Sequence, residues 1–178
     1  MHSSVKKLAF VFLGLAVIVS VFLLTKSTYV HASKKDGKKF DDWSASCTKE
    51  DTNAKIPSIC LLSQQVNITQ DNAQQPLALY QIGYIGPKKE LKLITTLPLG
   101  VRLDSGTSVI SSKKLISPGK FTVCNQSGCQ SISDISEEDL QTILNTTENT
   151  VAFMNTEGKQ VGIPFSIKGL SEGLKYIK

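Results

Sequence analysis

The feature that most constrains this chain is an apolar run near its N-terminus, because it decides the compartment in which the rest folds. Residues 8–24, "LAFVFLGLAVIVSVFLL", follow the basic pair Lys6-Lys7. Further on, Val30-His31-Ala32 resembles the small-x-small site that signal peptidase cuts. A basic start, an apolar stretch and such a site are together typical of a secretory signal peptide. We therefore expect residues 1–32 to direct export.

The same run also fits an uncleaved membrane anchor. Its 17 residues lie at the lower edge of the roughly 17–25 apolar residues that span a bilayer. Under both interpretations the chain from residue 33 onward lies outside the cytoplasm, with a polar leader at 33–39 and a single domain at 40–178. Cleavage after Ala32 would leave a chain long enough for one domain with a genuine core.

The charge of the exported part is close to balanced. Removing the three basic residues before position 33 leaves 17 basic against 15 acidic side chains. The basic doublets, such as Lys88-Lys89 and Lys113-Lys114, are scattered and have few aromatic neighbours. This pattern favours solvated loops over a nucleic-acid or anionic-lipid surface. We expect no nucleic-acid partner, and membrane contact only if the N-terminal segment is uncleaved.

Four cysteines follow the apolar run: Cys47, Cys60, Cys124 and Cys129. An even number of cysteines in an oxidising compartment predicts two disulfides. Three pairings are possible, and we favour the two local ones, Cys47–Cys60 and Cys124–Cys129. Loops of this size would each contribute roughly 2–3 kcal/mol in the chain-entropy model. The second pair flanks the turn "NQSG" and predicts a bridge across a hairpin.

Other chemistry lacks the residues it needs. The histidines, His2 and His31, both precede the expected cut, and the cysteine spacings do not match structural zinc sites. Neither pair is the Cys-x-x-Cys at a helix start that thiol oxidoreductases use. We therefore expect no metal, no cofactor, no small-molecule substrate and no enzymatic activity.

Paired carboxylates are the remaining route to acid–base catalysis. Neighbouring side chains on a strand point to opposite faces, so Asp41 and Asp42 are not expected to share a proton. The cluster Glu137-Glu138-Asp139 is better explained as the start of a helix capped by Ser136. Trp43 beside a cysteine is expected in the core. A carboxylate-only hydrolase stays as a minor alternative.

The rest of the chain alternates short strand patterns with turns. Strands are expected at 40–47, 59–68, 77–85 and 90–103, and turns at 70–76 and 86–89. Residues 113–136 predict strand, turn at Ser117-Pro118-Gly119, strand, turn, strand. A helix is expected at 136–146, then a hairpin around Glu157-Gly158, then a short helix or turn at 168–178. The fold class is therefore mainly β, a sandwich or barrel-like domain with one short late helix and two disulfides.

Five segments in this order resemble the invasion-associated locus B (IalB) family of bacterial exported proteins. They are "DDWSASC", "CLLSQQ", "LPLGVRLDSG", "FTVCNQSGC" and "IPFSIKGL". The most specific are Pro98-Leu99-Gly100-Val101 and the Gly128-Cys129 turn. Asp41 stands where the family pattern has Gly. The resemblance covers about residues 40–170 and implies a β-rich periplasmic or secreted domain, associated in some pathogens with entry into host cells.

That resemblance supplies no catalytic residue. We expect a non-enzymatic envelope or secreted protein that acts through contacts with a host-cell or envelope protein, possible roles being host-cell entry and virulence. The alternative is an accessory subunit of a periplasmic or inner-membrane complex, such as a secretion apparatus, held by an uncleaved anchor. Localisation is then the periplasm or the medium, or the periplasmic face of the inner membrane.

Overall fold

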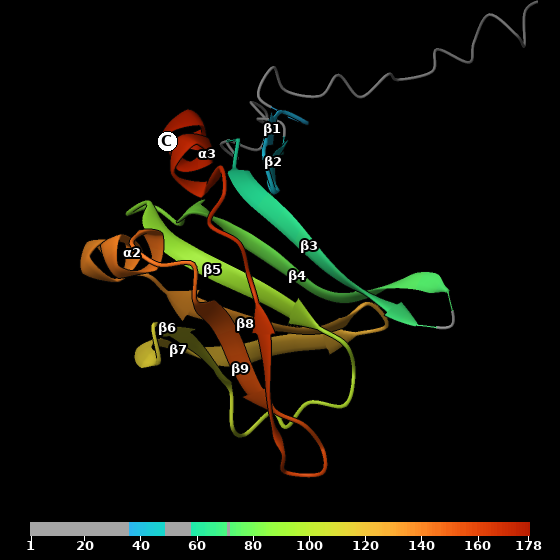
Figure 1. Cartoon of the computed structure of the whole chain (residues 1–178). Helices are drawn as coiled ribbons and strands as arrows, with labels where there is room; N and C mark the ends of the chain where they lie inside the picture. The colour runs from blue at the N-terminus through green and yellow to red at the C-terminus, as the bar shows by residue number, and fades with distance from the viewer. Residues whose placement is uncertain (1–35, 49–57, 71) are drawn as a thin grey trace, which may run out of the picture. The chain divides into compact units, whose positions relative to one another are not determined.

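The computed structural model describes residues 36–48, 58–70 and 72–178. The expected signal peptide or anchor at 1–32, and the leader up to residue 35, lie outside the described residues. The described part is mainly β, with two helices (Figure 1). Its strands and helices are β1 (Lys39–Phe40), β2 (Trp43–Cys47), β3 (Cys60–Gln70), β4 (Ala73–Ile85), β5 (Glu90–Leu97), β6 (Thr107–Ser111), β7 (Lys114–Asn125), β8 (Gly128–Asp134), α2 (Glu137–Leu144), β9 (Asn149–Met154), β10 (Gln160–Pro164) and α3 (Leu170–Ile177).

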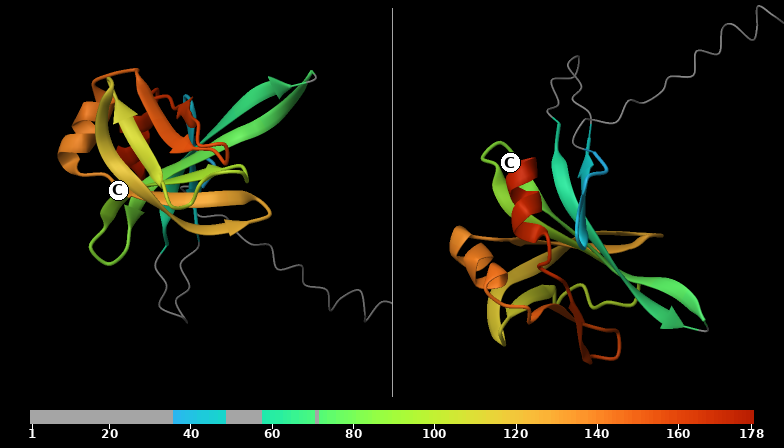
Figure 2. Two further views of the ribbon diagram at one scale, coloured as in Figure 1. Left: turned by 90° about the horizontal axis from the view of Figure 1, so that it is seen from below. Right: turned by 45° about the horizontal axis from the view of Figure 1, so that its top comes forward.

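The strands form one antiparallel sheet whose order is β1-β2-β3-β4-β5-β8-β7-β6-β9-β10. The sheet is strongly twisted and curls (Figure 2), as antiparallel sheets with many strands do. Side chains then join its two ends: Trp43 Nε1 of β2 donates to the carbonyl of Ser166, just after β10, at 2.8 Å. The sheet therefore has the barrel-like form that the sequence predicted, and its end strands meet through side chains.

The core lies inside this curl, because alternate residues of each strand point inward. In β5 the buried positions are Leu91, Leu93, Thr95 and Leu97, so one face of this strand lies in the core. Trp43 is 1% exposed, so its predicted place in the core is also confirmed.

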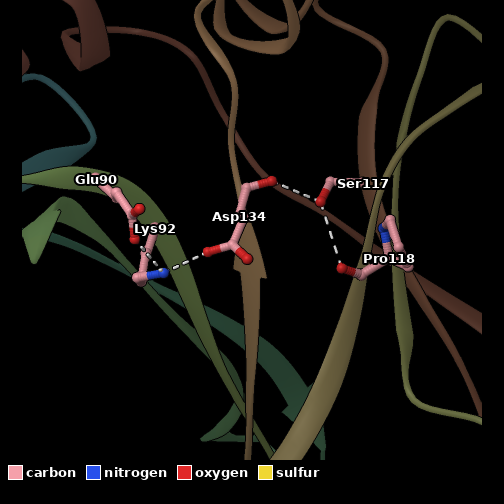
Figure 3. A network of polar contacts seen from close by, with 5 residues as sticks. All are labelled: Glu90, Lys92, Ser117, Pro118 and Asp134. Atoms are coloured by element: carbon pink, nitrogen blue, oxygen red, sulfur yellow. Dashed lines mark hydrogen bonds and ion pairs between the residues drawn. The ribbon is translucent and has the colours of Figure 1, made fainter. Parts of the chain in front are cut away.

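The predicted turn at Ser117-Pro118-Gly119 is wrong, because β7 runs through it. The chain turns instead at Ser112-Lys113, where both residues have positive φ, as two-residue hairpin turns require. Ser117 is buried and its hydroxyl donates to the carbonyl of Asp134 at 2.7 Å (Figure 3). Pro118 is tolerated because β7 pairs there with β6 alone, so β8 needs no donor from it. This turn connects β7 to β6, a strand that the sequence analysis did not predict.

The carboxylate of Asp134 continues this contact to β5. Lys92 bonds to Asp134 and to Glu90 (Figure 3), and these hydrogen bonds raise the pKa of its ammonium group. The network spans β5, β8 and β7 at one level of the sheet. It fixes the register of β7 at the point where β7 changes neighbour from β6 to β8.

The structure has two late helices where the fold class predicted one. In α2, Ser136 is the N-cap, as the sequence predicted, and it forms a capping box with Asp139. The short helix expected at 168–178 is α3, in which two glycines permit close approaches. A Cβ would lie 2.0 Å from the carbonyl oxygen of Phe40 at Gly169 and 2.6 Å from Leu62 Cδ1 at Gly173. In the described part of the chain, no helix is long and apolar enough to cross a bilayer.

Candidate functional site

Two strands extend past their neighbours and form an arm. On one side, β2 pairs only with Cys60–Ser63 of β3, and on the other, β5 pairs only with Leu79–Ile85 of β4. Residues 64–70 and 72–78, the arm, therefore continue as a two-stranded ribbon beyond the sheet (Figures 1 and 2). In the described residues no strand lies along either outer edge of the arm.

The second strand of the arm begins earlier than the sequence predicted. Residues 70–76 were expected to form a turn, with the next strand starting at residue 77. In fact β4 starts at Ala73, and the described side of the turn is Asn72, which has a φ of 60°. Opposite Val66 and Asn67, the register of β4 skips Leu77, which makes a β-bulge beside Pro76. Pro lacks an N–H and occurs in sheets at edges and bulges, so this edge position accommodates it.

A groove of about 530 Å³ follows the β4 side of the arm. We call it the β4 groove. The described residues that line it include no charged side chain; they are Gln65, Pro76, Leu77, Ala78, Leu79, Thr96, Leu97, Pro98, Leu99, Gln126, Ser127, Gly128 and Gln130. They come from the arm, from the end of β5 and from the β7–β8 turn.

The β4 groove exists because β5 stops at Leu97. In the sheet order β5 lies between β4 and β8, so those two strands are about 9.5 Å apart, two strand spacings, along the length of β5. Pro98 ends the ladder because it has no N–H to donate. Beyond it, the place of one strand is left between the arm and the β7–β8 turn.

The floor of the β4 groove carries an unsatisfied hydroxyl. Thr96 Oγ1 is buried and, within the described residues, has no hydrogen-bond partner. Buried polar atoms without a partner are uncommon in folded proteins and each calls for an explanation. At the mouth of the same groove the Leu99 side chain is 63% exposed. An exposed apolar side chain beside a concave surface is a feature of a binding site.

The Cys124–Cys129 disulfide holds the far wall of the β4 groove. Cys124 and Cys129 are directly opposite each other in the β7–β8 ladder, and Ser127 N–H donates to Asn125 Oδ1 at 2.8 Å within the turn. Gly128 has a φ of 126°, and a Cβ there would lie 2.2 Å from the carbonyl oxygen of Leu97. Both disulfides have the predicted pairing: Cys47 and Cys60 are also opposite residues, in β2 and β3.

A second hollow, of about 540 Å³, lies on the β3 side of the arm. The side chain of Gln64, which lines this hollow, is bonded within the fold. The Gln64 amide accepts from Ser166 N–H at 2.8 Å and donates toward the Ser166 carbonyl at 3.4 Å, beside the Trp43 indole. These bonds close the barrel, so we assign this hollow a structural role.

The two groups of candidate carboxylates belong to different elements of the structure. Asp41 and Asp42 form the turn between β1 and β2, so the expectation that they sit on a strand is wrong. Glu137, Glu138 and Asp139 form the first turn of α2. In the part of the chain that the structure describes, no three His, Cys, Asp or Glu side chains gather as a metal site. The absence of catalysis and of a metal remains a prediction.

The groove was not predicted as a site, although its parts were singled out. The segments "LPLG" and "NQSGC" that carry the family resemblance meet at its wall and mouth. The sequence did not predict the strand order, which places β8 next to β5.

These features define a class of protein: a mainly β domain with a curled antiparallel sheet, two cross-strand disulfides and a projecting arm. The family model for the invasion associated locus B (IalB) protein matches residues 43–178, and the chain belongs to this family. Membership and the disulfides are consistent with an exported protein.

Among solved structures, the chain is similar in fold to invasion associated protein B from Bartonella henselae. The TM-score is 0.63 at 12% sequence identity, over 79% of this chain and 92% of that chain. No curated protein matches the sequence.

Proposed function

We propose that this IalB-family protein is a non-enzymatic exported protein that acts through contacts with another protein. It works in the periplasm or after secretion, and its partner is a component of the cell envelope or of a host cell. A contribution to host-cell entry is part of this proposal, in line with the invasion-associated name of its structural relative. The β4 groove is the contact surface.

One observation carries the proposal. Leu99 is 63% exposed at the mouth of an uncharged groove that is framed by a disulfide-held turn. Exposing a leucine to water forgoes about 1.5–3 kcal/mol of burial, and a partner that covers it recovers this energy. Large exposed apolar side chains beside a preformed concave surface are typical of contact sites.

Photo-crosslinking in cells tests the proposal. A photoreactive amino acid at Gln126, on the groove wall, should link the exported protein to a discrete protein partner. The Leu99→Ser substitution should reduce that link about tenfold, the loss expected from about 1.4 kcal/mol of contact energy. The matched control is Leu115→Ser, since Leu115 is 58% exposed on β7 but does not line the β4 groove.

Two results would contradict the proposal. One is an equal effect of the two leucine substitutions. The other is the absence of any link from the groove together with turnover of a small substrate by the purified protein, which would favour an enzyme.

The second candidate function is an accessory subunit of a periplasmic or inner-membrane complex. The observation that favours it is the apolar run at residues 8–24, which as an uncleaved anchor would hold the domain at the membrane. N-terminal sequencing of the exported protein decides between the two: a start at Ser33 removes the anchor, and an intact Met1 supports it.

A further inference from the structure

We infer that the β4 groove binds its partner by strand addition: an extended, uncharged segment of another protein pairs with the outer edge of β4. This inference rests on the proposed function and adds the mode of binding and the chemistry of the segment. Three independent features of the described residues support it.

The first feature is an unpaired strand edge. Residues 73–78 of β4 pair with β3 on one side, and no described strand lies on the other. Exposed N–H and C=O groups on such an edge recruit further strands, and proteins limit this with lysine, proline, a β-bulge, a short strand or a cover. Pro76 and the bulge at Leu77 protect one end of this edge, so new pairing is expected mainly at residues 73–75. Residues 72–78, "NAQQPLA", include no charged side chain that would oppose it.

The second feature is the place where β5 ends. Before that point β5 separates β4 from β8, and beyond it the arm and the β7–β8 turn both line the β4 groove. If the strand spacing continues, we expect room beside β4 for one more strand, whereas a second two-stranded arm would need about twice that width. A single extended segment can therefore lie along β4, with its backbone bonded to β4, as in other complexes formed by strand addition.

The third feature is the chemistry of the lining. A charged side chain entering the β4 groove would lose water without gaining an opposite charge, because no charged residue lines it, and this desolvation is costly. Amide groups of Gln65, Gln126 and Gln130 instead offer hydrogen bonds to neutral polar groups. The segment is therefore expected to carry small apolar, hydroxyl or amide side chains.

Amide hydrogen exchange with a defined probe tests the inference. The probe is a capped hexapeptide of alternating valine, threonine and glutamine, added at millimolar concentration to the isotope-labelled protein in its exported form. Pairing with β4 should slow exchange about tenfold at amides within residues 73–78, because a hydrogen-bonded amide exchanges only when the pairing opens. Amides of β10, a strand at the end of the sheet order, serve as the internal control.

Two further peptides separate strand addition from side-chain contact. In one, alternate backbone nitrogens are methylated, which removes donors and leaves the side chains unchanged. In the other, lysine and glutamate replace the threonines and glutamines. Both should leave exchange at residues 73–78 unchanged.

Several outcomes would overturn the inference. They are equal protection by the methylated peptide, no protection at residues 73–78 by the unmodified one, or protection that appears without peptide and rises with protein concentration, which would assign the edge to a second copy. A partner that still crosslinks at Gln126 and depends on Leu99 would, in those cases, leave the proposed function standing and remove only this mode of binding.

Discussion

Gly128 shows at the scale of one residue how closely the wall of the β4 groove is built. Its φ of 126° is rare for residues with a side chain, and its absent Cβ would meet the carbonyl oxygen of Leu97 at 2.2 Å. Gly158 has a positive φ of 74°, yet nothing lies within 4 Å of its Cβ position. A side chain at Gly158 would therefore cause backbone strain alone, whereas one at Gly128 would add a steric conflict.

We predict that Gly158→Ala costs about 1–2 kcal/mol of unfolding free energy, from backbone strain alone. Gly128→Ala should cost at least about 3 kcal/mol, because overpacking against a backbone carbonyl adds to that strain. Denaturant unfolding of the two variants with disulfides intact measures the difference. Equal costs would show that the approach of the turn to Leu97 is not tight.

A second prediction at this scale concerns the unpartnered hydroxyl of Thr96. Thr96→Val replaces a buried, unsatisfied oxygen with a methyl group of similar size, which should stabilise the protein by about 1 kcal/mol. Thr107→Val is the matched control, since Thr107 Oγ1 is 2.9 Å from Ser131 Oγ in the core. That change leaves Ser131 without its partner and should destabilise by about 1–3 kcal/mol. Destabilisation by both variants would mean that the Thr96 hydroxyl is already satisfied.

At the scale of elements, the two disulfides stabilise hairpins of different span. Cys47 and Cys60 are 13 positions apart, and Cys124 and Cys129 are 5 apart. In the chain-entropy model, replacing the first pair with serine should cost about 3 kcal/mol and replacing the second about 2 kcal/mol. Thermal unfolding of the two double variants gives the order. A melting temperature that is unchanged without Cys124–Cys129, with binding lost, would mean that this bridge serves the groove and not the fold.

Elements were predictable from the sequence where the signal was local. The N-cap at Ser136 and the strand that begins at Glu90 depend on residues within one turn or one strand, and both predictions are confirmed. The turn at Ser117-Pro118-Gly119 was wrong because those residue types favour turns, whereas their role depends on where β7 changes from one neighbouring strand to the other. Likewise Gly169 and Gly173 are explained by distant contacts with Phe40 and Leu62, which no local pattern contains.

At the scale of the molecule, the cysteine pairing followed from export and chain order, but the groove did not. It requires β8 to lie beside β5, two strands that are more than 30 positions apart in the sequence, and it requires β5 to end where β4 continues into the arm. Closure of the barrel also depends on contacts between residues far apart in the sequence. The side chains of Trp43, Gln64 and Tyr80 each form a hydrogen bond with a backbone group in or after β10. A local sequence pattern does not predict such pairs.

Tyr80 provides a test of that closure through pH. Its ring is fully buried, and its hydroxyl donates to the carbonyl of Ile163 in β10 at 2.8 Å. Burial raises the pKa of the Tyr80 phenol above its ordinary value of 10.0, because the charged phenolate would lose its water. In the unfolded chain the phenol ionises near pH 10, whereas the folded protein keeps it neutral.

A raised pKa in the folded state fixes the sign of the pH effect. The stability that neutral Tyr80 contributes is complete below pH 10 and declines as the pH rises above 10, because the unfolded state then releases a proton that the folded state retains. Tyr80→Phe should lower stability at pH 8 by about 1 kcal/mol, through the lost hydrogen bond, but should show a shallower decline between pH 10 and 11.5. Brief denaturant titrations across that range, with the disulfides intact, measure both slopes. Parallel slopes would mean that Tyr80 ionises in the folded protein, and therefore that water reaches the seam between β4 and β10.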